Sequence, residues 1–137
     1  MTASALIGAA TGIYLRSASC GIIAFFAGIL IDIDHVMDFL ISHGRGSFSK
    51  FYETMLRANI EKFYGVLHSY EVVCALWVCI SVFSLGAYWI SFAVGVTQHL
   101  ILDQLFNPIR PWGYFLTFRM LKGFKTDDIV YRHKIKF

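Results

Sequence analysis

The sequence predicts an all-α integral membrane bundle of about four transmembrane helices with a C-terminal interfacial amphipathic segment, in a single membrane domain, residues 1–137. Of the 137 residues, 57% are hydrophobic and 15% are charged, and the mean hydropathy is +0.60. The apolar residues form runs that approach the roughly 20 residues needed to cross a bilayer. Neither lysine nor arginine occurs in residues 17–44 or 63–109. A chain of this size needs no large core if the bilayer supplies its apolar surroundings.

The first two predicted helices follow the first two apolar runs. Residues 3–15 are short for a full span, so we expect this helix to be tilted or interfacial. No basic segment precedes the run, which favours a retained helix over a cleaved signal peptide. Residues 18–41 form the second span, which carries the acidic motif DIDHVMD in its C-terminal half.

The next two predicted spans come after a polar stretch, residues 43–62, whose second part has the pattern of a short amphipathic helix. The third span is residues 64–85. A turn near Gly86 leads to the fourth, residues 87–106, which Asn107-Pro108 ends. The three cysteines lie in apolar runs without paired close spacing, and we expect them to be small buried hydrophobic residues.

The basic residues are distributed unevenly along the chain. With four spans, both termini and the middle loop lie on one side of the membrane, which then holds Arg45, Lys50, Arg57, Lys62, Arg110, Arg119, Lys122, Lys125, Arg132, Lys134 and Lys136. The other side holds Arg16. This asymmetry predicts cytoplasmic termini in a bacterial inner membrane. Residues 111–137 mix aromatic and apolar residues with basic ones, as an interfacial segment does.

Acidic and histidine side chains lie within the runs that lack lysine and arginine. They are Asp32, Asp34, His35, Asp38, His68, Glu71, His99 and Asp103. An unpaired carboxylate at membrane depth is costly and marks a functional site. Because the same runs offer no lysine or arginine, a bound metal ion is the expected counter-charge. The predicted topology places all of these groups at one depth, near the cytoplasmic face.

The first motif is D-x-D-H-x-x-D, residues 32–38. On a helix, Asp34 and Asp38 share a face, as do Asp32 and His35. Together the side chains cover a face that is too broad for one ion and wide enough for two. The alternative is a helix end at the membrane surface with solvated carboxylates, which the apolar flanking residues disfavour.

The other two motifs pair a histidine with an acid about one helical turn further on. His68 and Glu71 have the i, i+3 spacing of ligands in di-iron and di-manganese carboxylate bundles. A helix start in which the dipole favours Glu71 would give the same pattern. His99 and Asp103 either both bind metal, or Asp103 orients a ligating imidazole. The alternative for this pair is a hydrogen bond between helices.

At these residues the chain resembles the membrane-bound metal-dependent hydrolase family, small multi-span bacterial proteins. The resemblance rests on D-I-D-H at residues 32–35, His68-Ser69, and G-x-x-x-H-x-x-x-D from Gly95 to Asp103. The family is similar to zinc-dependent phospholipases C, which implies phosphoester hydrolysis by a cluster of metal ions. The family pattern also has a histidine near the N-terminus and a proline before the acidic block. This chain has Thr2, Ala3 and Ser4, and then Ile31, at those places, which implies one ligand and one metal fewer.

The sequence thus predicts a hydrolase with one or two divalent metal ions, of which zinc, manganese and iron suit mixed imidazole and carboxylate ligands. The expected ligands are Asp32, Asp34, His35, His68, His99 and Asp103. Glu71 and Asp38 are the expected catalytic acids, with Glu71 as the base that takes a proton from water. The expected substrate is amphiphilic, a phosphoester of a phospholipid or polyprenyl lipid reached from the cytoplasmic leaflet, with the basic tail near its headgroup.

Other functions are compatible with parts of this pattern. A non-catalytic metal-binding accessory membrane protein would keep the same ligands. A metal or proton transporter would also place these groups in the membrane, but the apolar outer half of the bundle offers no pathway. A haem protein would not surround its histidines with carboxylates. The net charge of +3 is too small to indicate nucleic acid. Small residues such as Gly8, Gly12 and Gly21 allow close packing within a chain or between chains of an oligomer.

Overall fold

The computed structural model describes residues 2–44, 49, 51, 54 and 61–131. Within these residues the ordered elements are helices and no strand is present, so the prediction of an all-α fold is confirmed. The amphipathic helix expected in the polar stretch lies largely outside the described residues, as do the last residues of the tail.

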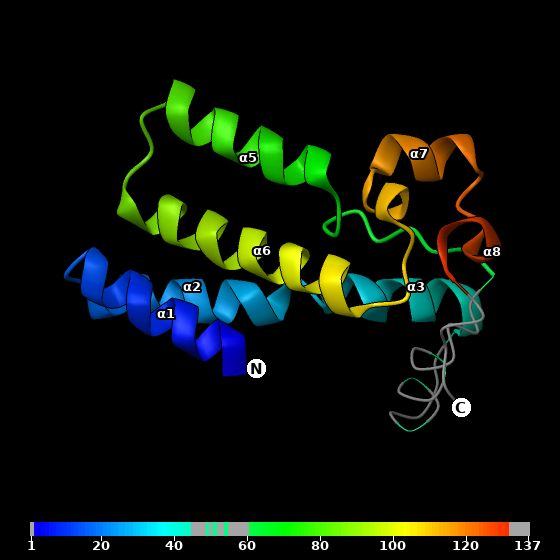
Figure 1. The fold of residues 1–137 in the computed structure, drawn as a ribbon, viewed down its shortest axis with the longest axis horizontal. Coiled ribbons are helices and arrows are strands. Elements are labelled where there is room, and N and C mark those ends of the chain that lie inside the picture. The colour runs from blue at the N-terminus through cyan, green and yellow to red at the C-terminus, as the bar shows by residue number, and fades with distance from the viewer. Residues whose placement is uncertain (1, 45–48, 50, 52–53, 55–60, 132–137) are drawn as a thin grey trace.

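Two nearly collinear helices form the longest element of the fold, drawn in blue to cyan in Figure 1. They are α2 (Ala18–Leu30) and α3 (Ile33–His43), and the predicted second span covers both. Among the described residues, Ala18–Ser42 is the one stretch long and apolar enough to cross a membrane, at 25 residues. The α1 helix (Thr2–Tyr14) and the α5 helix (Tyr70–Val82) are apolar but shorter. A tight turn at Ile31 and Asp32 separates α2 from α3, because the Asp34 and His35 amides bond the carbonyls three residues before them.

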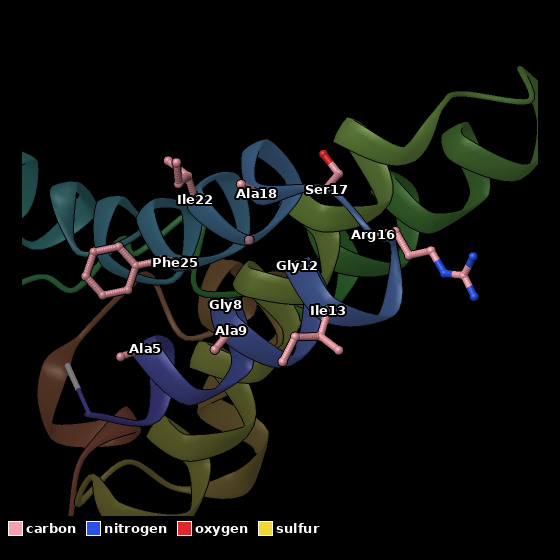
Figure 2. Close-up of a pocket in the computed structure, with 11 residues that line it drawn as sticks. Ala5, Gly8, Ala9, Gly12, Ile13, Arg16, Ser17, Ala18, Ile22 and Phe25 are labelled. Carbon is pink, nitrogen blue, oxygen red and sulfur yellow. The ribbon is translucent and has the colours of Figure 1, made fainter.

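The α1 helix (Thr2–Tyr14) packs against α2 through small residues. A Cβ on Gly8 would lie 2.8 Å from the Gly21 carbonyl oxygen, and a Cβ on Gly21 would lie 2.7 Å from the Gly8 oxygen. These glycines therefore serve packing within the chain. On the outer side of this pair is an open groove of about 610 Å³ (Figure 2), and glycine and alanine from both helices line much of it.

The α6 helix (Ala87–Phe106) lies across α2, and α5 (Tyr70–Val82) lies on the other side of α6 (Figure 1). The bounds of α6 coincide with the predicted fourth span. The core between these helices is formed by Ala27, Ile31, Val73, Val96, Leu100 and Tyr114. Cys74 and Cys79 on α5 are exposed rather than buried, whereas Cys20 is buried as expected.

The α5 helix is shorter than the predicted third span because residues 64–69 form a loop. Gly65 has φ +48°, a left-handed conformation that favours glycine and interrupts a helix. The amides of this loop bond side-chain carboxylates of α3 in place of helix carbonyls. Apolar composition alone does not reveal this, because the competing acceptors come from another helix.

The C-terminal segment folds onto the end of the bundle as three short helices, η1 (Pro111–Tyr114), α7 (Leu116–Leu121) and α8 (Thr126–Ile129). Figure 1 shows α7 and α8 gathered above α3, at the end opposite the α1–α2 and α5–α6 turns. One continuous amphipathic segment was expected here. Gly123, with φ +61°, ends α7 and turns the chain back.

Candidate metal centre

The histidine and aspartate side chains of the three motifs meet where the α2–α3 turn, the loop before α5 and the last turns of α6 come together. One atom from each of Asp32, His35, His68 and Asp103 lies within 4.8 Å of the others. This group has the donor chemistry of a site for zinc, manganese or iron. The prediction that the chain can bind a metal ion is supported to this extent, and the identity of the metal stays open.

His68 occupies the centre of the cluster and is 2% exposed. Its Nε2 lies 3.6 Å from Asp32 Oδ1 and 3.6 Å from Asp103 Oδ2, while its Nδ1 lies 3.4 Å from Asp34 Oδ2. An N–H at Nδ1 that points to Asp34 leaves the Nε2 lone pair directed at the other two carboxylates. A carboxylate partner of this kind fixes the tautomer of a metal-ligating histidine.

His99 approaches the same carboxylates from α6. Its Nε2 lies 3.2 Å from Asp32 Oδ1 and 3.4 Å from Asp103 Oδ2. Its Nδ1 lies 2.5 Å from the Gly28 carbonyl oxygen. Because that carbonyl can only accept, Nδ1 carries the proton, and Nε2 again has its lone pair free unless it is protonated.

Unpartnered ring nitrogens indicate that the cluster suits a metal ion. The Nε2 atoms of His68 and His99 and the Nδ1 of His35 are buried without a hydrogen bond to any described residue. Buried polar atoms are normally paired, so each needs an explanation. A cation between the Nε2 atoms and the carboxylates would satisfy both, and the residues present therefore fit a divalent metal.

Asp34 and Asp38 hold the loop before α5. Asp38 is 1% exposed and accepts the Tyr64 and Gly65 amides, each at 3.2 Å. Asp34 accepts the Leu67 amide and, at 3.2 Å, the His68 amide, in addition to the His68 ring. Asp34 thus touches a ligand candidate without belonging to the group of four, and the oxygens of Asp38 are directed at the backbone.

Glu71 is directed at α7, away from the histidines. Its two carboxylate oxygens accept the Leu116 and Thr117 amides at 2.9 Å and the Thr117 hydroxyl at 2.8 Å. Among the described residues, no ion pair within 4 Å joins a Glu71 oxygen to a histidine nitrogen. A carboxylate at a helix start satisfies amides that lack partners within the helix. The structure therefore gives Glu71 a structural contact where the sequence predicted a base.

Arg119 is a buried cation near the site that sequence reasoning missed. It is 0% exposed and donates to the Gly65 and His68 carbonyls at 2.8 and 3.0 Å. Burial lowers the pKa of Arg119, and the negative charges of Glu71, Asp34 and Asp38 oppose that shift. Arg119 thus lies near the acids, but its hydrogen bonds among the described residues go to backbone carbonyls and none goes to a carboxylate. Nothing in the tail sequence distinguishes Arg119 from Lys122 or Lys125.

No protein-family model matches the chain, and neither a curated protein nor a solved structure matches it. The resemblance to the membrane-bound metal-dependent hydrolases stays a prediction that rests on the three motifs.

Proposed function

We propose that the chain is a membrane-embedded metal-dependent hydrolase that acts at the cytoplasmic face on a phosphoester of an amphiphilic substrate, a phospholipid or polyprenyl lipid. The observation that carries the proposal is the convergence of three separate segments on one cluster. His68 and His99 direct Nε2 at Asp32 and Asp103, all within 3.6 Å. Arg119, a buried cation, donates to backbone carbonyls, and the structure gives it no hydrogen bond to these carboxylates among the described residues.

A membrane location is supported by the large apolar side chains on the surface of the helices. Exposed examples on α1, α2, α5 and α6 are Leu6, Ile13, Ile22, Phe26, Leu30, Val78, Val82, Tyr88, Trp89, Phe92, Ile101, Leu105 and Phe106. Scattered exposed residues of this kind are normal, but apolar surface on every long helix suits lipid better than water. A bundle of four spans is consistent with this surface and forms part of the proposal.

The chemistry follows from which acids remain available. His35, His68 and Asp103 would supply three ligands, the usual number at catalytic sites that keep an open position. A divalent ion held there would lower the pKa of a water molecule and polarise a phosphoryl oxygen. Asp32 is 55% exposed at its side chain and lies at the rim of the cluster, so we assign it the proton transfer. Asp38 and Glu71 are left out of this role because backbone amides bind their oxygens.

An amphiphilic substrate is supported by the surface next to the cluster. Trp112, Met120 and Leu121 are exposed by 60% or more, and exposed Lys122 follows them directly. Aromatic and basic side chains together are typical of the membrane interface, where the headgroup of a lipid would lie. A lipid entering from the side would present its phosphoester near this end of the bundle.

The decisive test is the metal content of detergent-purified protein, followed by turnover of a lipid phosphate. We expect one or two equivalents of a transition metal in the wild type and in Lys122→Gln, a change at an exposed position outside the cluster. The double variant His99→Ala, Asp103→Ala should lose most of it, because Asp103 is a proposed ligand and the Nε2 of His99 lies 3.4 Å from the Asp103 carboxylate. Metal-dependent phosphate release by the wild type and none by Asp32→Asn would support the hydrolase. A folded wild type that binds no added zinc, manganese or iron would contradict it.

One observation favours a second candidate, a non-catalytic metal-binding membrane protein. Two of the acids expected to act in catalysis, Asp38 and Glu71, are occupied by backbone amides. The same experiment separates the two functions, because the second candidate binds metal and releases no phosphate from any lipid offered.

A further inference from the structure

The loop of residues 63–69, which carries His68, is bound along its backbone on two sides. On the first side, α3 presents two carboxylates to the loop amides. Asp38 accepts from Tyr64 and Gly65, and Asp34 accepts from Leu67 and His68. Four amides of an irregular segment are thereby paired without secondary structure, which buried backbone requires.

On the second side, Arg119 of α7 binds the loop carbonyls. Its Nη1 donates to Gly65 O at 2.8 Å and its Nη2 donates to His68 O at 3.0 Å. The guanidinium therefore spans the segment from the turn at Gly65 to the ligand candidate itself. The space is closely fitted, since a Cβ on Gly65 would lie 2.6 Å from Nη1.

Arg119 also supports a second ligand candidate through an aromatic ring. Its guanidinium carbon lies 5.5 Å from the centre of the Phe63 ring. Phe63 also contacts His35, whose ring centre lies 5.7 Å from that of Phe63. The His35 ring centre lies 4.6 Å from that of His68. Arg119 thus binds the backbone of His68 and also contacts the Phe63 ring, which packs against His35.

We infer that Arg119 is a positioning residue for the metal centre: it fixes the loop of residues 63–69 so that the His68 and His35 imidazoles face Asp32 and Asp103. The inference rests on the proposed metal site and adds a residue from the C-terminal segment to it. Arg119 does not touch the ligand atoms. Its effect passes through the His68 carbonyl and the Phe63 ring, and groups that orient ligands commonly change metal affinity 10- to 100-fold.

The chemistry of the contact makes arginine specific at this position. A planar guanidinium donates along two directions at once, whereas an ammonium on a flexible stem is a point donor. Arg119→Lys keeps the charge and most of the apolar stem, so it tests the two-carbonyl contact. Lys122→Gln, at an exposed position at the end of the same helix, is the matched control.

The experiment uses full-length protein in detergent loaded with Co²⁺, whose visible absorption reports the number and geometry of its ligands. We expect Arg119→Lys to bind Co²⁺ 10- to 100-fold more weakly than the wild type, with an altered spectrum, and Lys122→Gln to match the wild type in both. Helix content and unfolding temperature are measured alongside. An unchanged Co²⁺ affinity and spectrum in folded Arg119→Lys would overturn the inference.

A second measurement keeps the test independent of the metal. Hydrogen exchange of the metal-free protein reads the amides of residues 63–69 directly. We expect faster exchange there in Arg119→Lys and no change in Lys122→Gln. If the wild type binds no metal and residues 63–69 still exchange faster in Arg119→Lys, the proposed function is contradicted, and the role of Arg119 in fixing the loop is supported. If the wild type binds metal and the loop exchanges normally in the variant, the positioning role fails alone.

If Arg119→Lys does not fold, Glu71→Ala takes its place, because it releases the start of the helix on which Arg119 sits. Faster exchange in both residues 63–69 and 116–121, with weaker Co²⁺ binding, is the expected result. Exchange that rises in residues 116–121 alone, with Co²⁺ binding unchanged, would overturn the inference.

Discussion

At the scale of single residues, polar pairs inside the bundle join helices that otherwise meet through apolar side chains. Trp77 on α5 donates its indole N–H to the Thr97 hydroxyl on α6 at 3.0 Å. That hydroxyl donates in turn to the Ala93 carbonyl within its own helix at 2.6 Å. The Thr97 oxygen thus acts as acceptor and donor together, and the indole nitrogen has its partner.

Replacement of Thr97 by valine should therefore weaken the contact between α5 and α6. We expect a loss of about 0.5–1.5 kcal/mol in the free energy of unfolding, the range of single hydrogen bonds between membrane helices. Ser81→Ala is the control, because that exposed hydroxyl donates to the Trp77 carbonyl of its own helix and joins no second helix among the described residues. Reversible unfolding in mixed detergent measures both. Equal losses in the two variants would contradict the expected role of Thr97.

At the scale of elements, the site depends on how closely α6 approaches α2. A Cβ on Gly95 would overlap the Ala24 carbonyl oxygen and lie 2.9 Å from the Ala27 side chain. Backbone occupies the space that a larger residue would need, so the two helices would have to move apart. His99, one turn further along α6, bonds the Gly28 carbonyl of α2 and would move with its helix.

Gly95→Ala should accordingly destabilise the fold by about 1–3 kcal/mol, the usual cost of overpacking, and weaken metal binding as well. Gly86→Ala is the matched control. Gly86 lies just before the same helix with a backbone outside the left-handed region, and a Cβ there would meet no atom within 4 Å. Thermal unfolding with and without added zinc measures both effects. A Gly95→Ala protein as stable as Gly86→Ala would show that the helices do not pack this closely.

At the scale of the whole molecule, charge divides between the two ends of the bundle. Arg16 lies in the turn between α1 and α2, at the end shared with the α5–α6 turn (Figure 1). Lys62, Arg110, Lys122 and Lys125 belong to the segments at the opposite end, and the metal centre lies between the two ends, at the α2–α3 turn. In the proposed orientation, the end that holds the four basic residues faces the cytoplasm and the end that holds Arg16 faces outward.

Single cysteines introduced at the two ends test this orientation in intact cells. In a background with Cys20, Cys74 and Cys79 replaced by alanine, a membrane-impermeant maleimide should label Arg16→Cys from outside. Lys122→Cys should react only after the membrane is made permeable. Labelling of both positions in intact cells, or of Lys122→Cys alone, would contradict the proposed topology.

The parts of the fold that follow from local sequence were predictable. The α6 bounds coincide with an apolar run between Gly86 and Asn107-Pro108, and the ring nitrogens and carboxylates of three motifs converge because helices of one bundle share their ends. The loop of residues 63–69 was not predictable, because its amides are paired by Asp34 and Asp38 from a different helix. The buried position of Arg119 was not predictable either, because its partners are backbone carbonyls of a distant loop. Every residue has such a carbonyl, so the sequence does not distinguish these two.

The contact between Arg119 and the His68 carbonyl can form only late in synthesis, because Arg119 is made well after His68. The two residues are separated by 51 positions in the chain. At the usual ~5–20 residues per second, a ribosome needs roughly 3–10 s to travel from one to the other. During that interval the acids of α3 and the imidazole of His68 already exist, and the arginine that completes the loop does not. If the centre binds metal as proposed, loading of a correctly formed centre comes after elongation has passed α7, because Arg119 can reach the loop only then.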